Sequence, residues 1–293
     1  MIIRDQLCAP GFPSRPNEDI GGGVPESGMA WVIDGATGLA PSPLIAKEGS
    51  TDAQWFSHTA HALLQHVLKQ GGLDTSNPEM FARQALHAAL SMMMDAFDKD
   101  KTHTPSSGFD MPCASMCLLH SPVEGDIHCL GLGDCTVILE TPDGIRACEG
   151  DPVLAALDAV SCAEAAPYLA KGMSFPEVRD SIGDTLKKHR NLLNQDDGYW
   201  IFSLTLECLK NMWHHTFPKQ VGGHALIMSD GFYALIDKYG KYTHETLLEK
   251  CKAVGLPALY EELRFIEQEE DPLCTKYIRL KQCDDATAVF LQL

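Results

Sequence analysis

Apolar segments that end in aspartate, usually followed by glycine, recur along this sequence and constrain its fold more than any other feature. They read Trp31-Val32-Ile33-Asp34-Gly35, Leu130-Gly131-Leu132-Gly133-Asp134 and Leu226-Ile227-Met228-Ser229-Asp230-Gly231. The pair Asp284-Asp285 precedes a final apolar segment, and Glu18-Asp19 precedes a glycine cluster. A sheet holds the side chains at its strand ends with little freedom, and a neighbouring glycine lets backbone carbonyls approach an ion closely.

Apolar periodicity predicts runs of strands separated by helices. Strands are expected at Met29–Ile33, Met116–Leu119, Ile127–Leu132, Thr136–Leu139, Tyr199–Leu204, Ala225–Met228 and Ala286–Leu291. Helices are expected from Thr51 or Asp52 to Gly71, from the Asn77 cap through Phe97, twice between about Val153 and Leu193, and around Glu245–Ala253 and Pro257–Glu270. This order lacks βαβ alternation and favours an α+β protein with antiparallel sheets. No linker-like stretch divides the chain, so a single domain over residues 1–293 is expected.

The charge of the chain excludes some partners. Lys and Arg number 23 against 40 Asp and Glu, a formal net charge of −17. Nucleic acid and anionic membrane surfaces would repel such a chain, so neither is an expected partner. A cation such as a metal ion is the natural complement, while the alternative is that the acids serve only solubility.

The sequence also predicts the cellular location of the protein. No segment reaches the roughly 18 to 20 apolar residues that cross a bilayer, and Arg4 and Asp5 interrupt the start of the chain, so export is not expected. Eleven scattered cysteines without a CxxC pair fit buried thiols in a reducing cytoplasm. His58 and His61 lack zinc-binding spacing, and the acids from Glu261 to Asp271 are interpreted as a solvated helix face.

The aspartates suggest metal chemistry when they are taken together. Each Asp-Gly alone is a common turn signal. Several carboxylates in one place, however, repel one another unless a hard cation neutralises them. Oxygen-only ligation of this kind suits Mg²⁺ or Mn²⁺.

Five of these segments, taken in order, resemble the motifs of the metal-dependent protein serine/threonine phosphatases of type 2C. They are Asn17-Glu18-Asp19, Val32-Ile33-Asp34-Gly35-Ala36-Thr37-Gly38, Gly131-Leu132-Gly133-Asp134-Cys135, Met228-Ser229-Asp230-Gly231-Phe232 and Asp284-Asp285-Ala286-Thr287-Ala288-Val289. The resemblance spans nearly the whole chain. It implies a four-layer α-β-β-α sandwich, with two packed antiparallel sheets flanked by helices and a dinuclear centre where strand ends meet.

The resemblance also implies roles for individual residues. Asp34 would bridge two Mg²⁺ or Mn²⁺ ions, the carbonyl of Gly35 would bind one, and Asp230 and Asp284 would bind the other. Glu18 and Asp19 would bind the metals through water, by holding metal-bound waters. Water acidified by the ions would attack the phosphorus of a phosphorylated protein, so no protein nucleophile is needed. A cytoplasmic monomer is expected.

Departures from the family pattern refine this expectation. Arg15 is the candidate for binding the substrate phosphate, although it stands one position closer to Asp19 than usual, and Arg4 is held in reserve. Ala36 replaces a histidine found in animal members, which favours the bacterial branch. Asp134 would hold a third metal, but Ala234 replaces the acid that would share it.

Two functions remain open at this level. The first is a metal-dependent phosphatase acting on phosphoserine and phosphothreonine in proteins. The second is a non-catalytic binding or regulatory module with the same fold. A degenerate module should have lost at least one of Asp34, Asp230 and Asp284, and all three are present.

Overall fold

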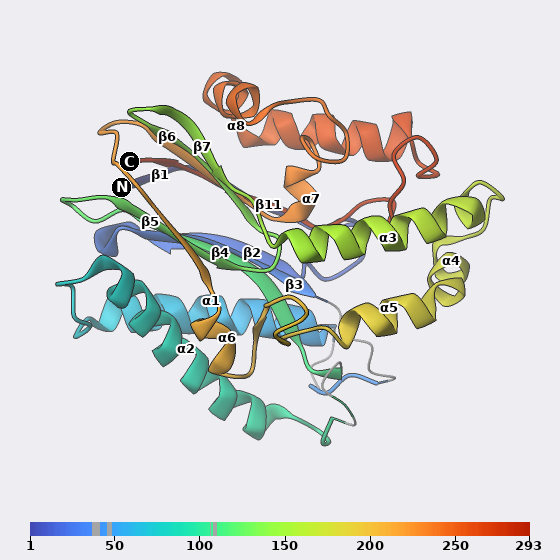
Figure 1. Cartoon of the computed structure of the whole chain (residues 1–293), viewed down its shortest axis with the longest axis horizontal. Helices are drawn as coiled ribbons and strands as arrows, with labels where there is room; N and C mark the ends of the chain where they lie inside the picture. Colours follow the sequence, from blue (N-terminus) through green and yellow to red (C-terminus); the bar gives the residue numbers. More distant parts are fainter. Residues whose placement is uncertain (37–41, 46–48, 106, 108–109) are drawn as a thin grey trace.

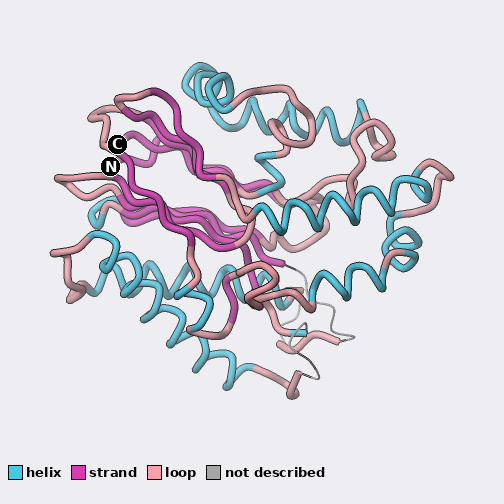
Figure 2. Tube along the Cα trace, viewed as in Figure 1, coloured by secondary structure: helices cyan, strands magenta, loops and turns pink. Residues whose placement is uncertain are grey.

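The computed structural model describes residues 1–36, 42–45, 49–105, 107 and 110–293. Two antiparallel sheets lie face to face and helices cover the outer face of each (Figures 1 and 2). The predicted α+β class, with two packed antiparallel sheets flanked by helices, is confirmed. Thr37 and Gly38 of the second motif lie outside the described residues.

Each sheet combines strands that are distant in sequence. One sheet has the order β1-β11-β10-β6-β7, formed by Ile2–Ala9, Ala286–Gln292, His224–Met228, Thr136–Thr141 and Gly144–Cys148. The other has the order β2-β3-β4-β5-β9, formed by Asp19–Val24, Met29–Ala36, Cys113–His120, Ile127–Leu132 and Trp213–Phe217. The short strand β8, Phe202–Ser203, pairs with β4.

The central strands are apolar on both faces because both faces are buried. In β3, Ala30 and Val32 pack between the sheets, whereas Trp31 and Ile33 pack against the helical layer. Alternate residues of one strand therefore belong to different hydrophobic clusters. This explains why the sequence reads as continuous apolar runs rather than as an apolar and polar alternation.

The helices follow their capping signals. Helices α1 (Asp52–Gln70) and α2 (Pro78–Asp100) cover the β2–β9 sheet. The short helix α7 (Asp230–Tyr233) and the long helix α8 (His244–Phe265) cover the other sheet. The Asn77 side chain accepts from the amide of Met80 at 3.0 Å, which confirms the predicted cap of α2. Helix α8 contains a kink at Gly255, whose φ is 76°, between the two predicted helical segments. Short helical turns complete the chain: η1 (Pro25–Ser27), α6 (Glu207–Lys210) and the π-helical η3 (Ile266–Glu270).

Three helices, rather than the predicted two, occupy the segment between Val153 and Leu193. They are α3 (Pro152–Leu169), α4 (Phe175–Ser181) and α5 (Gly183–Arg190). Figure 1 shows them together at one end of the sheet sandwich, on the side opposite both chain termini. Val178 and Ile182 join Ala165 and Leu169 in a small hydrophobic cluster of their own. The break at Ile182, where φ is −102° and ψ is 11°, separates α4 from α5.

Some strands escape prediction because they lack apolar patterning. Strand β1 has three consecutive polar residues, Arg4 to Gln6, β2 contains three consecutive glycines, and β7 and β9 lie at sheet edges. The predicted strand at Tyr199–Leu204 is reduced to the two residues of β8. Edge pairing and a packed partner, rather than local propensity, decide these segments.

The interpretation of the segment from Glu261 to Asp271 as a solvated face is wrong for two of its acids. Glu267 is buried and pairs with Arg264, while Asp271 is buried and accepts from Arg279 Nη1 at 2.7 Å. The Asp271 carboxylate also accepts from the backbone amides of residues 275 to 277. A buried carboxylate is stable only with such partners, so these acids order the loop that leads to Asp284.

Other sequence expectations concern thiols, histidines and membranes. All eleven cysteines are free thiols; nine, including Cys113 and Cys117, are buried as predicted, whereas Cys8 and Cys162 are only partly buried. The indole of Trp31 donates to His61 Nδ1 at 3.2 Å. Burial is the main cause that lowers the pKa of His61 to about 4. In the part of the chain that is described, no helix is long and apolar enough to cross a bilayer.

Candidate functional site

Aspartates from four separate segments line one cavity of about 240 Å³ at the end of the sheet sandwich. Asp34 lies near the end of β3, Asp134 follows β5, Asp230 begins α7, and Asp284 precedes β11. Asp19, at the start of β2, is the direct register partner of Asp34. The strand ends therefore bring together the acids that the sequence separates by up to 250 positions, from Asp34 to Asp284.

Two glycines are needed for the close contacts around this cavity. A Cβ atom at Gly35 would lie 2.6 Å from the carbonyl oxygen of Glu18. One at Gly231 would lie 1.9 Å from the carbonyl oxygen of Asp285. Any side chain at these positions would push apart the segments that carry the carboxylates. The amide of Gly35 also donates to the Glu18 carbonyl at 3.1 Å, which fixes the early acidic motif against β3.

Asp285 joins two of the sequence motifs and the segment at Gly11, a role that sequence reasoning missed. Its two carboxylate oxygens accept from the amides of Gly11 at 2.7 Å and Glu18 at 2.6 Å. Arg264 donates to the carbonyl oxygen of Asp284 at 2.7 Å from the opposite side. Asp285 therefore positions neighbouring segments, whereas Asp284 faces the cavity. The only signal in the sequence was the acid pair itself.

The carboxylates raise one another's pKa values. Burial is the largest cause for Asp34 and Asp19, and repulsion from neighbouring carboxylates adds to it, so both pKa values lie well above the ordinary range. Burial and then Asp230 raise the pKa of Asp134 to about 7. The charges of Asp19 and Asp230 are the largest carboxylate contributions to the raised pKa of Asp34, and Asp19 is its register partner. The site thus concentrates negative charge that the protein alone does not fully neutralise.

Two lysines neutralise the opposite side of the site. Lys238 Nζ lies 3.3 Å from Asp230 Oδ2, and Lys281 Nζ lies 2.7 Å from Asp284 Oδ1. The Asp230 pKa is lowered although its burial raises it, because the charges of Lys238 and Lys281 outweigh that burial. The carboxylates of Asp230 and Asp284 are therefore ion-paired, whereas neighbouring carboxylates raise the pKa values of Asp19 and Asp34.

The oxygen donors of this site are of the kind that hard divalent cations prefer. Its donors are carboxylate oxygens and the nearby carbonyl of Gly35, and the buried Asp19 Oδ2, on a residue only 1% exposed, has no hydrogen-bond partner. Among the described residues, no group of three His, Cys, Asp or Glu side chains is arranged to hold one ion by itself. Mg²⁺ commonly takes only one or two carboxylates and keeps several waters, so this donor set fits such an ion.

The predicted phosphate-binding residues lie in different places. Exposed Arg15 lines a neighbouring cavity together with Glu18, Lys281 and Asp284. Arg4 lies on β1, hydrogen-bonded to Gln292, and lines neither of these cavities. The structure thus brings Arg15 beside the carboxylates but does not bring Arg4 there.

Sequence reasoning missed three basic residues at the carboxylate cavity. Arg179 of α4, Arg190 of α5 and Lys281 all line it together with the aspartates. Arg190 also donates to Cys113 Sγ at 3.2 Å, which holds α5 against the end of β4. No local motif marks these residues, because helices α4 and α5 reach the cavity only through tertiary packing.

The pKa of Asp134 predicts a pH-dependent stability difference. A folded pKa of about 7, above the ordinary aspartate value of 3.8, means that the folded state binds more protons than the unfolded state between those pH values. This contribution to stability is lost as pH rises toward 7. The melting temperature of Asp134→Asn should therefore exceed that of the wild type by a few degrees at pH 8, and by less at pH 4.5.

Thermal unfolding in EDTA at pH 4.5, 6 and 8 measures this difference. Asp126→Asn, the same chemical change at an exposed position before β5, is the matched control. A difference for Asp134→Asn that stays constant over this pH range would contradict the expectation.

Comparisons with known proteins concern the fold. No protein-family model matches the sequence, and no curated protein matches it. The serine/threonine phosphatase PstP/Ppp of Mycobacterium tuberculosis is 14% identical, with a TM-score of 0.57 over 100% of this chain and 99% of that one. The PstP catalytic domain in complex with two manganese ions is 13% identical, with a TM-score of 0.53 over 97% and 95%.

A third similar structure is PppA, a key regulatory component of T6SS in Pseudomonas aeruginosa. It is 15% identical, with a TM-score of 0.53 over 98% of this chain and 96% of that one. These similarities extend over essentially the whole length of each protein. The chain therefore has the fold of the metal-dependent serine/threonine phosphatases of type 2C.

Proposed function

We propose that this chain is a Mg²⁺- or Mn²⁺-dependent phosphatase that hydrolyses phosphoserine and phosphothreonine in proteins. The observation that carries the proposal is the cavity in which Asp34, Asp134, Asp230 and Asp284 meet beneath Arg179 and Arg190. Acids that hold cations beside guanidinium groups that bind phosphate form a suitable site for phosphoryl transfer. The fold shared with PstP supports this proposal.

Each residue has a proposed role. Asp34, the Gly35 carbonyl, Asp230 and Asp284 would hold two ions, and Glu18 and Asp19 would hold water bound to them. Such ions, when bound, would offset charge on the phosphoryl group and lower the pKa of the attacking water. A third ion at Asp134 is disfavoured, since the side chain of Ala234 provides no oxygen and the Lys238 ammonium, in the cavity that Ala234 lines, is paired with Asp230.

A non-catalytic binding or regulatory module is the second candidate. The observation that favours it is the pairing of Asp230 and Asp284 with lysine ammonium groups. These are two of the acids proposed to hold an ion, so the lysines compete with metal for them. PppA, described as a regulatory component, has the same fold.

Turnover of a phosphothreonine peptide separates the two candidates. Purified protein with added Mn²⁺ should release phosphate, and EDTA should stop the release. Asp34→Asn protein purified in the same way controls for contaminating phosphatases. Absence of turnover over a range of Mn²⁺ concentrations, or turnover that EDTA does not reduce, would remove the enzyme proposal.

Arg15 gives a specific kinetic prediction. Its guanidinium lies in the cavity beside Asp284, so Arg15→Ala should raise KM several-fold with a smaller effect on kcat. Arg179→Ala, which changes a residue common to that cavity and the carboxylate cavity, is the comparison. Arg146→Ala, on the exposed edge strand β7, is the control. An unchanged KM for Arg15→Ala would assign phosphate binding to the other arginines.

A further inference from the structure

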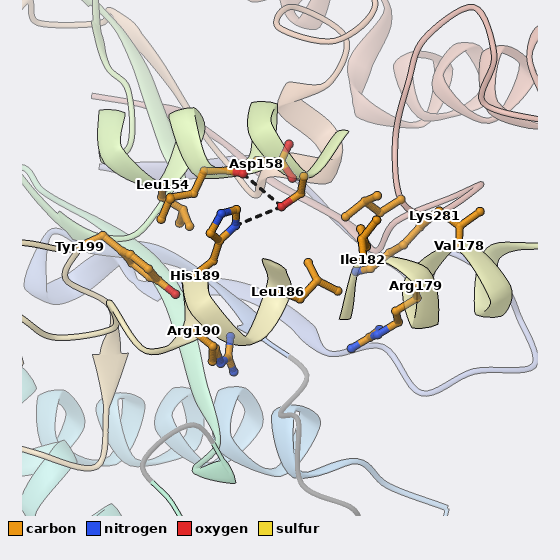
Figure 3. Close-up of a pocket in the computed structure, with 13 residues that line it drawn as sticks. Leu154, Asp158, Val178, Arg179, Ile182, Leu186, His189, Arg190, Tyr199 and Lys281 are labelled. Carbon is orange, nitrogen blue, oxygen red and sulfur yellow. Dashed lines mark hydrogen bonds between the residues drawn. The ribbon is translucent and has the colours of Figure 1, made fainter. Parts of the chain in front are cut away.

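A second pocket of about 240 Å³ opens beside the carboxylate cavity, between helices α3 and α5 (Figure 3). Its apolar walls come from Leu154 and Leu157 of α3, Val178 of α4, Ile182, and Leu186 of α5. Val178 and Ile182 are each 1% exposed, whereas the three leucines are only partly buried. The leucines therefore leave apolar surface available to a ligand.

Two polar groups of the pocket wall, those of Ser161 and His189, already have partners. The Ser161 hydroxyl is hydrogen-bonded to the carbonyl of Leu157 at 3.1 Å and to His189 Nδ1 at 3.1 Å. Figure 3 shows His189 between α3 and α5 with these bonds drawn. Because the serine and histidine satisfy each other, this part of the wall favours an apolar ligand group, whereas the charged residues Arg179, Arg190 and Lys281 lie where the pocket adjoins the carboxylate cavity.

This pocket is continuous with the carboxylate cavity. Leu154, Arg179, Arg190, Tyr199 and Lys281 line both. A phosphate group among the aspartates and arginines would therefore place a neighbouring part of the same molecule at the mouth of the apolar pocket. Successive residues of an extended peptide are about 3.3 Å apart, so a residue next to the phosphorylated one, or one further along, can reach it.

We propose that this pocket binds an apolar side chain that flanks the phosphorylated residue of the substrate. The proposal rests on the proposed phosphatase function and adds a substrate class to it: phosphoproteins with a leucine-like residue beside the phosphoserine or phosphothreonine. The pocket is smaller than the roughly 300–1,000 Å³ that typically encloses a whole small-molecule ligand. Its size thus fits one side chain better than a separate cofactor.

Peptide binding tests the proposal without depending on turnover. Peptides with a non-hydrolysable phosphonate in place of phosphothreonine, and with either leucine or serine at each flanking position, are titrated in Mn²⁺ by fluorescence anisotropy. Partial burial of one leucine should tighten Kd about tenfold at one flanking position at least. Leucine and serine peptides that bind within twofold of each other at every position would overturn the proposal.

Variants locate the preference in the pocket. Leu157→Gln and Leu186→Gln should reduce the leucine advantage to less than about threefold. Leu186→Phe, which fills the pocket without adding polarity, should do the same. Val160→Gln is the matched control, since Val160 lies on α3 but is 52% exposed and does not line the pocket. Thermal unfolding identifies variants that retain the fold, and a leucine advantage kept in all three folded pocket variants would place the contact elsewhere.

Hydrolysis of the corresponding phosphothreonine peptides separates this proposal from the proposed function. A leucine preference in binding without any hydrolysis would contradict the phosphatase reaction and support the apolar subsite. Hydrolysis without a leucine preference would support the phosphatase and overturn the subsite.

Discussion

Asp34→Asn should reduce Mn²⁺-dependent hydrolysis of a phosphothreonine peptide by about a thousandfold or more. Asp34 is the register partner of Asp19, and after burial the charges of Asp19, Asp230, Asp134 and Asp284 all raise its pKa, so it lies at the centre of the carboxylate cluster. Asparagine keeps the size of the side chain but lacks the negative charge that binds a cation. The rate over a Mn²⁺ titration measures the loss, and a rate within tenfold of the wild type would contradict the assigned role of Asp34.

The stability of the same variant shows that the loss is specific. Burial and neighbouring carboxylates raise the pKa of Asp34, so a neutral side chain at this position removes repulsion from the metal-free protein. In EDTA, Asp34→Asn should therefore melt no lower than the wild type. Mn²⁺ at a hundredfold excess over its Kd should stabilise the wild type by about 2.7 kcal/mol and the variant by much less. Asp143→Asn, in the exposed β6–β7 turn, should behave as the wild type in both assays.

The layered fold could be predicted because the apolar sequences of its central strands indicate that both faces of these strands are buried. Strands such as β3 and β10 are buried on both faces and therefore read as uninterrupted apolar runs. Strand β2 could not be predicted in this way. Its Gly21 lies against Val289 and Thr287 of the facing sheet, so its place depends on partners far along the chain.

Residues of the candidate site could be predicted where they lie at the ends of strands that are themselves predictable. Asp34 and Asp230 follow recognisable strands, so their meeting could be expected from sequence alone. Asp285 and Arg264 were not recognised, since they act on backbone groups of other segments. Lys238 was also not recognised. It contacts Asp230 from the segment that follows α7, and no periodic pattern marks that segment.

The two lysines should weaken metal binding at this site. Unit charges 4 Å apart interact by about 4 kcal/mol at an effective dielectric constant of 20. Lys281 is 52% exposed at its side chain and Lys238 is 25% exposed, so solvent reduces this value substantially. We expect about 1.4 kcal/mol for each lysine, which is about a tenfold change in Kd. Lys238→Met and Lys281→Met should each tighten Mn²⁺ binding by that factor, and the double variant by about a hundredfold if the effects add.

Calorimetric titration of Mn²⁺ into the metal-free proteins measures these affinities directly. Lys276→Met is the matched control, because Lys276 lies on the same loop but pairs with Glu270, which lines none of the cavities around the carboxylates. A Kd unchanged from the wild type in both single variants would contradict the competition between ammonium groups and metal. Lys281 also faces the cavity in which phosphate is proposed to bind, so its loss should raise KM while it tightens metal binding. These opposite changes distinguish a lysine that acts on both partners from one that only pairs with Asp284.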